Sequence, residues 1–219
     1  GSVRVGHQIA ERAGYRRLVL ELGGNDPFIV LSDADVDRAA HLAVQGAVRH
    51  SGQRCTAVKR ALVVEELADH FAERALHHMQ TLSTGDPSDP SVDLGTVISA
   101  DAAQLIARRV AGAVAAGASL LFGGEPRGAF YPPTLLDHVS PACELVAEET
   151  FGPVLPIIRC HNDIDEIIKI ANATKFGLSA AICSDRLDHV TRLIEGLAVG
   201  SVNVWEVPGY RTELTPFGG

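Results

Sequence analysis

Phe28-Ile29-Val30-Leu31 is an apolar run that a short acidic turn joins to residues 36–48, and this stretch decides the fold. An uninterrupted run of large apolar side chains predicts a buried strand. In residues 36–48 the apolar side chains recur at helical spacing on one face, and Asp33 or Asp35 can cap the helix. The apolar residues of that face are Val36, Ala39, Ala40, Ala43, Val44 and Ala47.

The alternation of apolar runs and amphipathic segments continues along the chain. It predicts an α/β fold with an open, mainly parallel twisted sheet covered by helices. Further strands are expected at residues 18–20, 61–64, 119–122, 134–136, 154–159, 178–183 and 199–204. Further helices are expected at residues 5–13, 67–82, 100–116, 164–172 and 187–197. No GxGxxG loop is present, so this motif gives no argument for dinucleotide binding.

Composition excludes several classes of protein. The chain has 219 residues, 46% of them hydrophobic, and a net charge of −8. These values argue against disorder, and the acidic balance argues against nonspecific binding to nucleic acid. No apolar run approaches the roughly 18 residues that a membrane span needs. No signal peptide is recognisable, so we expect a cytoplasmic protein without a membrane partner.

The cysteines and histidines show no metal-binding pattern. Cys55, Cys143, Cys160 and Cys183 are far apart and form no CxxC pair, which argues against a zinc site or a disulfide framework. Cys160 and Cys183 lie in apolar runs and are predicted to be buried. The histidines are scattered and lack ligand spacing such as HExxH, so no metal is expected.

One cysteine lies in a stretch that is too polar for a core, Gly52-Gln53-Arg54-Cys55-Thr56. A thiol attacks carbonyls as its thiolate, and Arg54 places positive potential beside Cys55. The backbone N–H groups around Thr56 can point at a developing oxyanion. On these residues alone, a nucleophile and an ordinary loop cysteine beside a surface arginine are both open.

Glu21-Leu22-Gly23-Gly24 places a carboxylate and two glycines at the end of a predicted strand. Glycine lets another backbone or a ligand approach closely. A carboxylate there would be partly removed from water, which makes it a better base. Because reactive groups of parallel sheets lie beyond the carboxyl ends of strands, we expect Glu21 and Cys55 at that edge. An ordinary strand-end glutamate before a turn is the alternative.

A third polar stretch is Glu148-Glu149-Thr150-Phe151-Gly152-Pro153. Paired carboxylates on a tight turn can accept hydrogen bonds from ribose hydroxyls, and Phe151 can pack on a flat ring. A solvated acidic loop with a buried phenylalanine is the alternative.

In this order, these three stretches and the closing Pro216-Phe217-Gly218-Gly219 resemble the aldehyde dehydrogenase superfamily over nearly the whole chain. One motif would be weak evidence, but four in order are specific. The resemblance implies that Cys55 attacks the aldehyde and that the thiohemiacetal becomes a thioester as NAD or NADP is reduced. It also implies that Glu21 activates the water that releases the acid. The N–H of Cys55 would form half of the oxyanion hole.

The resemblance further implies a cofactor contact and a domain division. Glu149 would hold the nicotinamide ribose, with Phe151 near the ring and Leu22 in the same contact. Gly1 and Ser2 would lie near the pyrophosphate. Residues 1–21 would then end the dinucleotide-binding domain, and 22–219 would form a catalytic domain truncated at its C-terminal end. The family's second oxyanion-hole residue, an asparagine, and its adenosine-ribose lysine are absent. We therefore expect a fragment of a protein that is a homo-oligomer when full length.

The substrate is suggested by residues 203–211, which resemble the corresponding stretch of the family's phosphonoacetaldehyde-oxidising members. A dianionic phosphonate calls for arginines with fixed, paired donors. In that fold Arg54, Thr56 and Arg211 would border the aldehyde tunnel. We therefore expect a small anionic aldehyde as substrate, phosphonoacetaldehyde oxidised to phosphonoacetate, and a role in phosphonate metabolism.

Several alternatives stay open. Non-phosphorylating glyceraldehyde-3-phosphate dehydrogenase shares the run around Cys55 and also needs an anion site, and lactaldehyde-type dehydrogenases are a third choice. From another class, a thiol esterase could use Cys55 and Glu21 without nicotinamide, but it would not need residues 149–151. The chain in isolation could also be inactive.

Overall fold

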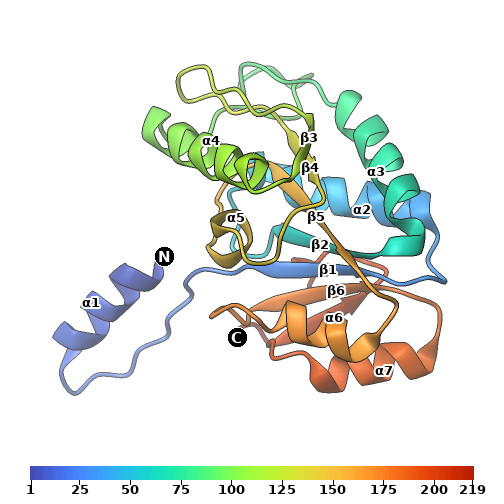
Figure 1. The fold of residues 1–219 in the computed structure, drawn as a ribbon. Helices are drawn as coiled ribbons and strands as arrows, with labels where there is room; N and C mark the ends of the chain where they lie inside the picture. Colours follow the sequence, from blue (N-terminus) through green and yellow to red (C-terminus); the bar gives the residue numbers. More distant parts are fainter.

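The computed structural model describes all 219 residues, which form a seven-stranded sheet of order β3-β4-β5-β2-β1-β6-β7 with helices on both faces (Figure 1). Neighbouring strands are parallel except for the edge pair β3 and β4. The predicted α/β class with an open, mainly parallel sheet is therefore confirmed. None of the helices combines the length and the apolar character needed to cross a membrane.

The elements follow the predicted alternation closely. The strands are β1 (Asp26–Val30), β2 (Val58–Val64), β3 (Ser119–Phe122), β4 (Thr134–Asp137), β5 (Val154–Cys160), β6 (Ser179–Cys183) and β7 (Ser201–Val204). The helices are α1 (Val3–Ala13), α2 (Val36–Val48), α3 (Glu65–Gln80), α4 (Ala100–Ala115), α5 (Glu144–Ala147), α6 (Ile164–Ala171) and α7 (Leu187–Gly196), with a short 3₁₀ segment η1 (Arg49–Gly52). Of the helical elements, α5 and η1 are not predicted.

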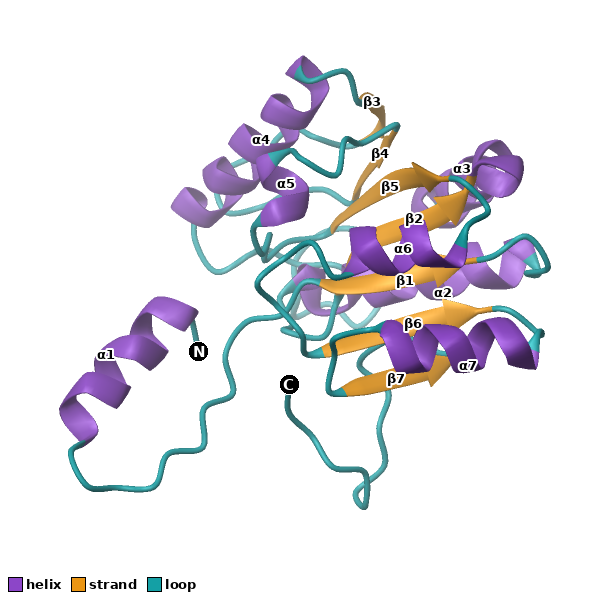
Figure 2. Ribbon diagram, turned by 60° about the horizontal axis from the view of Figure 1, so that its bottom comes forward, coloured by secondary structure: helices purple, strands orange, loops and turns teal.

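Alternation along the central strands builds a core on each face of the sheet. Phe28 and Val30 of β1 pack with α2 and α3, whereas Ile29 of the same strand packs with α4, α6 and α7. Figure 2 shows α2 and α3 on one side of the sheet and α6 and α7 on the other. Since both faces are covered, β1 and β2 are buried along their whole length. This explains why residues 28–30 of β1 and 61–64 of β2 are continuous apolar runs rather than alternating ones.

Helix α2 begins where the sequence predicts. The Asp35 side chain accepts a hydrogen bond from the N–H of Arg38, so Asp35 rather than Asp33 is the cap. Asp33 instead accepts hydrogen bonds from the hydroxyl of Ser184 and the N–H of Asp185. The predicted apolar face of α2 is buried against the sheet.

The predicted strand at residues 18–20 is wrong. The segment between α1 and β1 is extended but pairs with no strand, and Val19 is 90% exposed. Backbone in a strand is stabilised by hydrogen bonds to a neighbouring strand, and no neighbour lies beside this segment. In Figures 1 and 2 α1 and this segment project from the sheet.

The predicted position of the reactive residues at the carboxyl edge of the sheet is also wrong. Glu21 precedes β1, Cys55 precedes β2 and Glu149 precedes β5, and these three strands are parallel. The polar stretches therefore converge at the amino ends of the strands. The rule behind the prediction concerns loops that follow the carboxyl end of a strand and lead into a helix. Here the reactive groups lie instead in the segments that lead into the strands.

Candidate active site

Gly23 and Gly24 bring the three polar stretches together just before β1. A Cβ on Gly24 would overlap the carbonyl oxygen of Cys55, and one on Gly23 would overlap the carboxylate of Glu149. Only a residue without a side chain permits both approaches. The glycine pair therefore places the backbone of one stretch in direct contact with the other two.

A hydrogen bond joins the outer two of these stretches. The N–H of Gly24 donates to Glu149 Oε1 at 3.1 Å, across 125 residues of sequence. The carbonyl of Glu149 accepts a second bond of 2.6 Å from Nη1 of Arg109 in α4. Glu149 is thus held from two sides, and one of its carboxylate oxygens accepts no hydrogen bond within the chain.

The backbone before Cys55 makes an unusual left-handed turn. His50, Ser51 and Gly52 have φ angles of 56°, 54° and 68°. Such angles cost energy for residues that have a Cβ and often occur at functional sites. Gly52 also packs against the carbonyl of Gly152, where a Cβ would collide. The turn therefore leads directly into Cys55, and through Gly52 it packs against the loop that contains Glu149.

Cys55 lies half-buried in the loop between η1 and β2 as a free thiol. The next turn is closed by the N–H of Ala57, which donates to the carbonyl of Arg54 at 3.2 Å. The N–H groups of Cys55 and Thr56 donate to no acceptor in the chain. Two unpaired donors beside a half-exposed sulfur match what a developing oxyanion requires.

A pocket of about 550 Å³ lies between the end of α2 and residues 206–211, and Arg54, the residue before Cys55, lines it. Three arginines line the pocket: Arg49, Arg54 and Arg211. Of these, Arg54 and Arg211 are predicted from the sequence as substrate contacts. The acidic residues Glu206 and Asp93 also line this pocket. Cys55 itself is not part of the lining. Three arginines against two carboxylates leave the pocket with a net positive charge.

Two of these arginines are held in place. Nη2 of Arg54 donates to the carbonyl of Gly46 at 2.9 Å, while its buried Nε has no partner. Burial and the neighbouring Arg49 lower the pKa of Arg54. The guanidinium carbon of Arg211 lies 4.5 Å from the centroid of the Phe217 ring. Arg54 and the stacked Arg211 both line the pocket and keep their positive charge beside it.

The structure does not bring every predicted residue to this pocket. Thr56 is 8% exposed and packs against Gly209, so its side chain faces protein rather than the pocket. Glu21 is exposed in the described chain, contrary to the expectation of a partly desolvated carboxylate. Glu21 Oε1 lies next to Gly218 in the C-terminal segment, which returns to the amino ends of β6 and β7.

The residues predicted near the pyrophosphate lie at the start of α1. The hydroxyl of Ser2 accepts a hydrogen bond from the N–H of Val5 and so caps the helix. Leu22 packs against Gly6 of α1, where a Cβ would collide with the leucine side chain. The N-terminal end of α1 is the end that faces the sheet (Figures 1 and 2).

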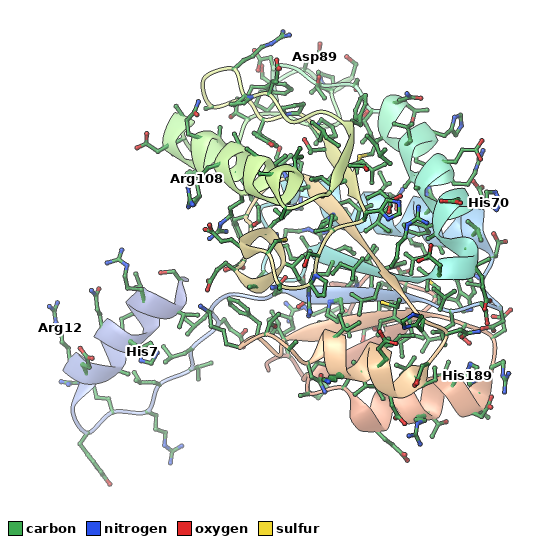
Figure 3. All side chains as sticks on the ribbon, in the orientation of Figure 1. His7, Arg12, His70, Asp89, Arg108 and His189 are labelled. Carbon is green, nitrogen blue, oxygen red and sulfur yellow. The ribbon has the colours of Figure 1, made fainter.

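Apart from His50 in the turn before Cys55, the histidines and the other cysteines form no part of the contacts described above. Cys160 and Cys183 are buried, as predicted, and burial raises the pKa of the Cys160 thiol to about 12. Figure 3 labels His7, His70 and His189, which lie on α1, α3 and α7. The chain contains no group of three or more metal-ligating side chains placed to hold an ion.

Sequence reasoning misses two charged residues of the site. Arg49 lines the pocket, and Lys59 is buried between the Cys55 loop and the Glu149 loop. Lys59 interrupts the apolar strand β2, and a charged residue inside such a run is a usable signal.

Comparison with known proteins agrees with this arrangement. The model of the aldehyde dehydrogenase family matches residues 1–219. Sulfoacetaldehyde dehydrogenase of Neptuniibacter caesariensis is 39% identical over 219 residues, which are 100% of this chain and 48% of that protein. Succinate-semialdehyde dehydrogenase [NADP(+)] of Mycobacterium avium is 42% identical over 207 residues, which are 92% of this chain and 44% of that protein.

A solved structure shows the same fold. The structure of glyceraldehyde-3-phosphate dehydrogenase GapN from Methanocaldococcus jannaschii, complexed with NADP, superposes with a TM-score of 0.95. It is 37% identical, and the match covers 100% of this chain and 47% of that one. The chain thus spans about half the length of the relatives it matches.

Proposed function

The chain belongs to the aldehyde dehydrogenase family, and from that premise we propose that the protein containing it oxidises a small anionic aldehyde to a carboxylic acid with NAD or NADP. The observation that supports this most is the cationic pocket lined by Arg54, the residue next to the half-buried Cys55. The substrate we propose is phosphonoacetaldehyde, and the product phosphonoacetate.

Cys55 is the proposed nucleophile. Its thiolate attacks the carbonyl carbon of the aldehyde, and the carbonyl oxygen gains negative charge in the tetrahedral intermediate. The unpaired N–H of Cys55, with that of Thr56 beside it, can donate to this oxygen. Donors fixed in advance stabilise the charge without reorganisation.

The residues present fit a nicotinamide cofactor. Glu149 keeps one carboxylate oxygen free of hydrogen bonds within the chain, so it can accept one from a ribose hydroxyl. Phe151 is 43% exposed beside it and offers a flat apolar surface. Gly23 leaves no side chain between Glu149 and the approaching backbone. When bound, the oxidised nicotinamide supplies the hydride acceptor of the reaction.

Glu21 is the proposed base that activates water for release of the acid. In the described chain its carboxylate is exposed and lies near Gly218. An exposed carboxylate is accessible to the water that it must deprotonate, and the attack of that water on the thioester frees Cys55. Gly1 and Ser2, at the start of α1, are the proposed neighbours of the pyrophosphate, because unpaired N–H groups at a helix start favour anions.

The pocket supports an anionic substrate rather than a neutral one. Arg54 and Arg211 both line the pocket, and their guanidiniums can donate hydrogen bonds to a tetrahedral anion. A phosphonate can accept several such bonds at once. Sulfoacetaldehyde is the second candidate, because its sulfonate has the same tetrahedral shape and a 39% identical relative bears that name.

The test is the formation of reduced cofactor by the full-length protein across a panel of aldehydes. The panel contains phosphonoacetaldehyde, sulfoacetaldehyde, succinic semialdehyde, glyceraldehyde-3-phosphate and lactaldehyde. The proposal expects the highest kcat/KM with phosphonoacetaldehyde. A higher value with lactaldehyde would contradict the anionic pocket, and ester hydrolysis without cofactor reduction would favour a thiol esterase.

A further inference from the structure

Lys59 is a buried cation that the proposed mechanism does not use. It lies in β2, four residues after Cys55, and only 3% of its surface is exposed. Its ammonium forms no ion pair within 4 Å. Burying an ammonium without an adjacent carboxylate is costly, so such a residue needs strong compensating contacts.

The contacts of Lys59 join two loops. Nζ donates to the carbonyl of Gly52 at 2.8 Å and to the carbonyl of Thr150 at 3.0 Å. Gly52 belongs to the left-handed turn before Cys55, and Thr150 lies between Glu149 and Phe151. Nζ also lies 5.1 Å from the centroid of the Phe151 ring, which adds a cation–π contact.

No other side chain spans these loops. Arg109 bonds only to the Glu149 loop, at the carbonyl of Glu149 and the hydroxyl of Thr150. Arg54 bonds to Gly46 in α2. The remaining ties run through glycines: Gly52 packs against the carbonyl of Gly152, and Gly24 donates to Glu149 Oε1 while lying against the carbonyl of Cys55.

The ammonium of Lys59 keeps its charge in spite of its burial. Burial lowers the pKa of Lys59 to about 8, while the nearby carboxylates of Glu149 and Asp26 counteract the decrease. At neutral pH the ammonium therefore carries its positive charge in most molecules. A charged donor makes shorter and stronger bonds to carbonyls than a neutral one.

We propose that Lys59 is a positioning residue that straps the Cys55 loop to the Glu149–Phe151 loop, so that the sulfur and the bound nicotinamide stay in register. The proposal rests on the proposed function, which assigns the nucleophile to one loop and the ribose contact to the other. A displacement of about 1 Å between reacting groups can reduce a rate about 100-fold.

The test uses three forms of the full-length enzyme: wild type, Lys59→Met and Lys59→Gln. Methionine and glutamine match each other in length, each about one atom shorter than lysine. Methionine donates no hydrogen bond, whereas the glutamine amide has two N–H donors for the two carbonyls and no charge. Single-turnover formation of reduced cofactor is measured with aldehyde carrying hydrogen or deuterium at C1. Hydrogen exchange of residues 52–55 and 149–151 is measured on the same proteins.

Lys59→Met should slow the isotope-sensitive step by about 10- to 100-fold, with the KM for aldehyde within about threefold of wild type. Exchange should increase in both loops together. Lys59→Gln should restore most of the rate and of the protection. A rate for Lys59→Met within threefold of wild type, or equal losses in both variants, would overturn the proposal.

If Lys59→Met does not fold, Lys59→Asn replaces it, because the shorter amide cannot reach both carbonyls. Equal rates for Lys59→Asn and Lys59→Gln would then overturn the proposal, as would failure of every variant to fold. If wild type oxidises no aldehyde, the proposed function fails. Hydrogen exchange alone then decides whether Lys59 holds the two loops together. If wild type is active and Lys59→Met has the same kinetics and exchange as wild type, the role of Lys59 is refuted and the proposed function is not.

Discussion

The N–H of Gly24 donates to Glu149 Oε1 at 3.1 Å, although 125 residues separate the two in sequence. Gly24 also lies against the carbonyl of Cys55, where any side chain would collide. One glycine thus contacts both the proposed nucleophile stretch and the proposed ribose stretch. The site is therefore a consequence of how segments enter the parallel strands β1, β2 and β5.

The nucleophile assignment predicts that Cys55→Ser in the full-length protein lowers aldehyde turnover by about a thousandfold or more, because a serine hydroxyl is a much weaker nucleophile than a thiolate. The measurement is the steady-state formation of reduced cofactor. Cys143→Ser is the matched control, since Cys143 is also a half-buried free thiol. It should keep wild-type turnover. Substantial activity in Cys55→Ser would remove the assignment.

The anion pocket predicts a selective effect of Arg211→Ala. Loss of a charged hydrogen bond should raise the KM for phosphonoacetaldehyde by about 10- to 100-fold. The KM for propionaldehyde, which has no anionic group, should change by less than about threefold. Arg192→Ala is the control, because Arg192 forms an exposed ion pair with Asp165 on the surface. Equal effects of Arg211→Ala on both aldehydes would refute the anion contact.

The left-handed turn predicts that Gly52→Ala is destabilising. The added Cβ would meet the carbonyl of Gly152, and the φ angle of 68° disfavours alanine. We expect a loss of about 3 kcal/mol in the free energy of unfolding, measured by urea titration. Gly112→Ala, at an exposed position in the last turn of α4 with nothing within 4 Å of the new Cβ, should gain about 0.5–1 kcal/mol. Similar stabilities for the two variants would contradict this packing.

The lowered pKa of the buried Lys59 predicts that the stability of the fold depends on pH. Its folded pKa is about 8, against an ordinary value of 10.5, so the folded state binds fewer protons than the unfolded state between these values. Stability should therefore rise with pH through this window, by up to about 3 kcal/mol from this residue.

The raised pKa of the buried thiol of Cys160, about 12, acts in the opposite direction above pH 9. The informative quantity is therefore the free energy of unfolding of wild type minus that of Lys59→Met, measured at pH 7 and pH 10. This difference should increase with pH. A constant difference would show that the ammonium is not buried as described.

The fold could be predicted because its central segments are unambiguous. Phe28 to Leu31 form a short apolar run, and the apolar residues of α2 recur at helical spacing directly after it. The stretches around Cys55 and Glu149 could be found because their polar residues contradict the surrounding apolar pattern. Their roles in catalysis and cofactor binding stay predictions.

Other features of the structure could not be predicted, because they depend on contacts with residues far away in the sequence. Leu18 to Leu20 have strand-like composition, but a strand requires a neighbour, and none is present. The turn at His50 and Ser51 carries no glycine at either residue, so its positive φ angles are set by tertiary contacts. The division at residues 21 and 22 and the homo-oligomer also stay predictions.

The most direct test of the central claim is to trap the acyl enzyme on Cys55. Full-length Glu21→Gln is mixed with phosphonoacetaldehyde and NAD or NADP, quenched, digested and analysed by mass spectrometry. Without the proposed base the thioester should persist, and the peptide containing Cys55 should carry a phosphonoacetyl group. Stoichiometric cofactor reduction with an unmodified Cys55 peptide, or with the adduct on Cys143, would contradict the claim.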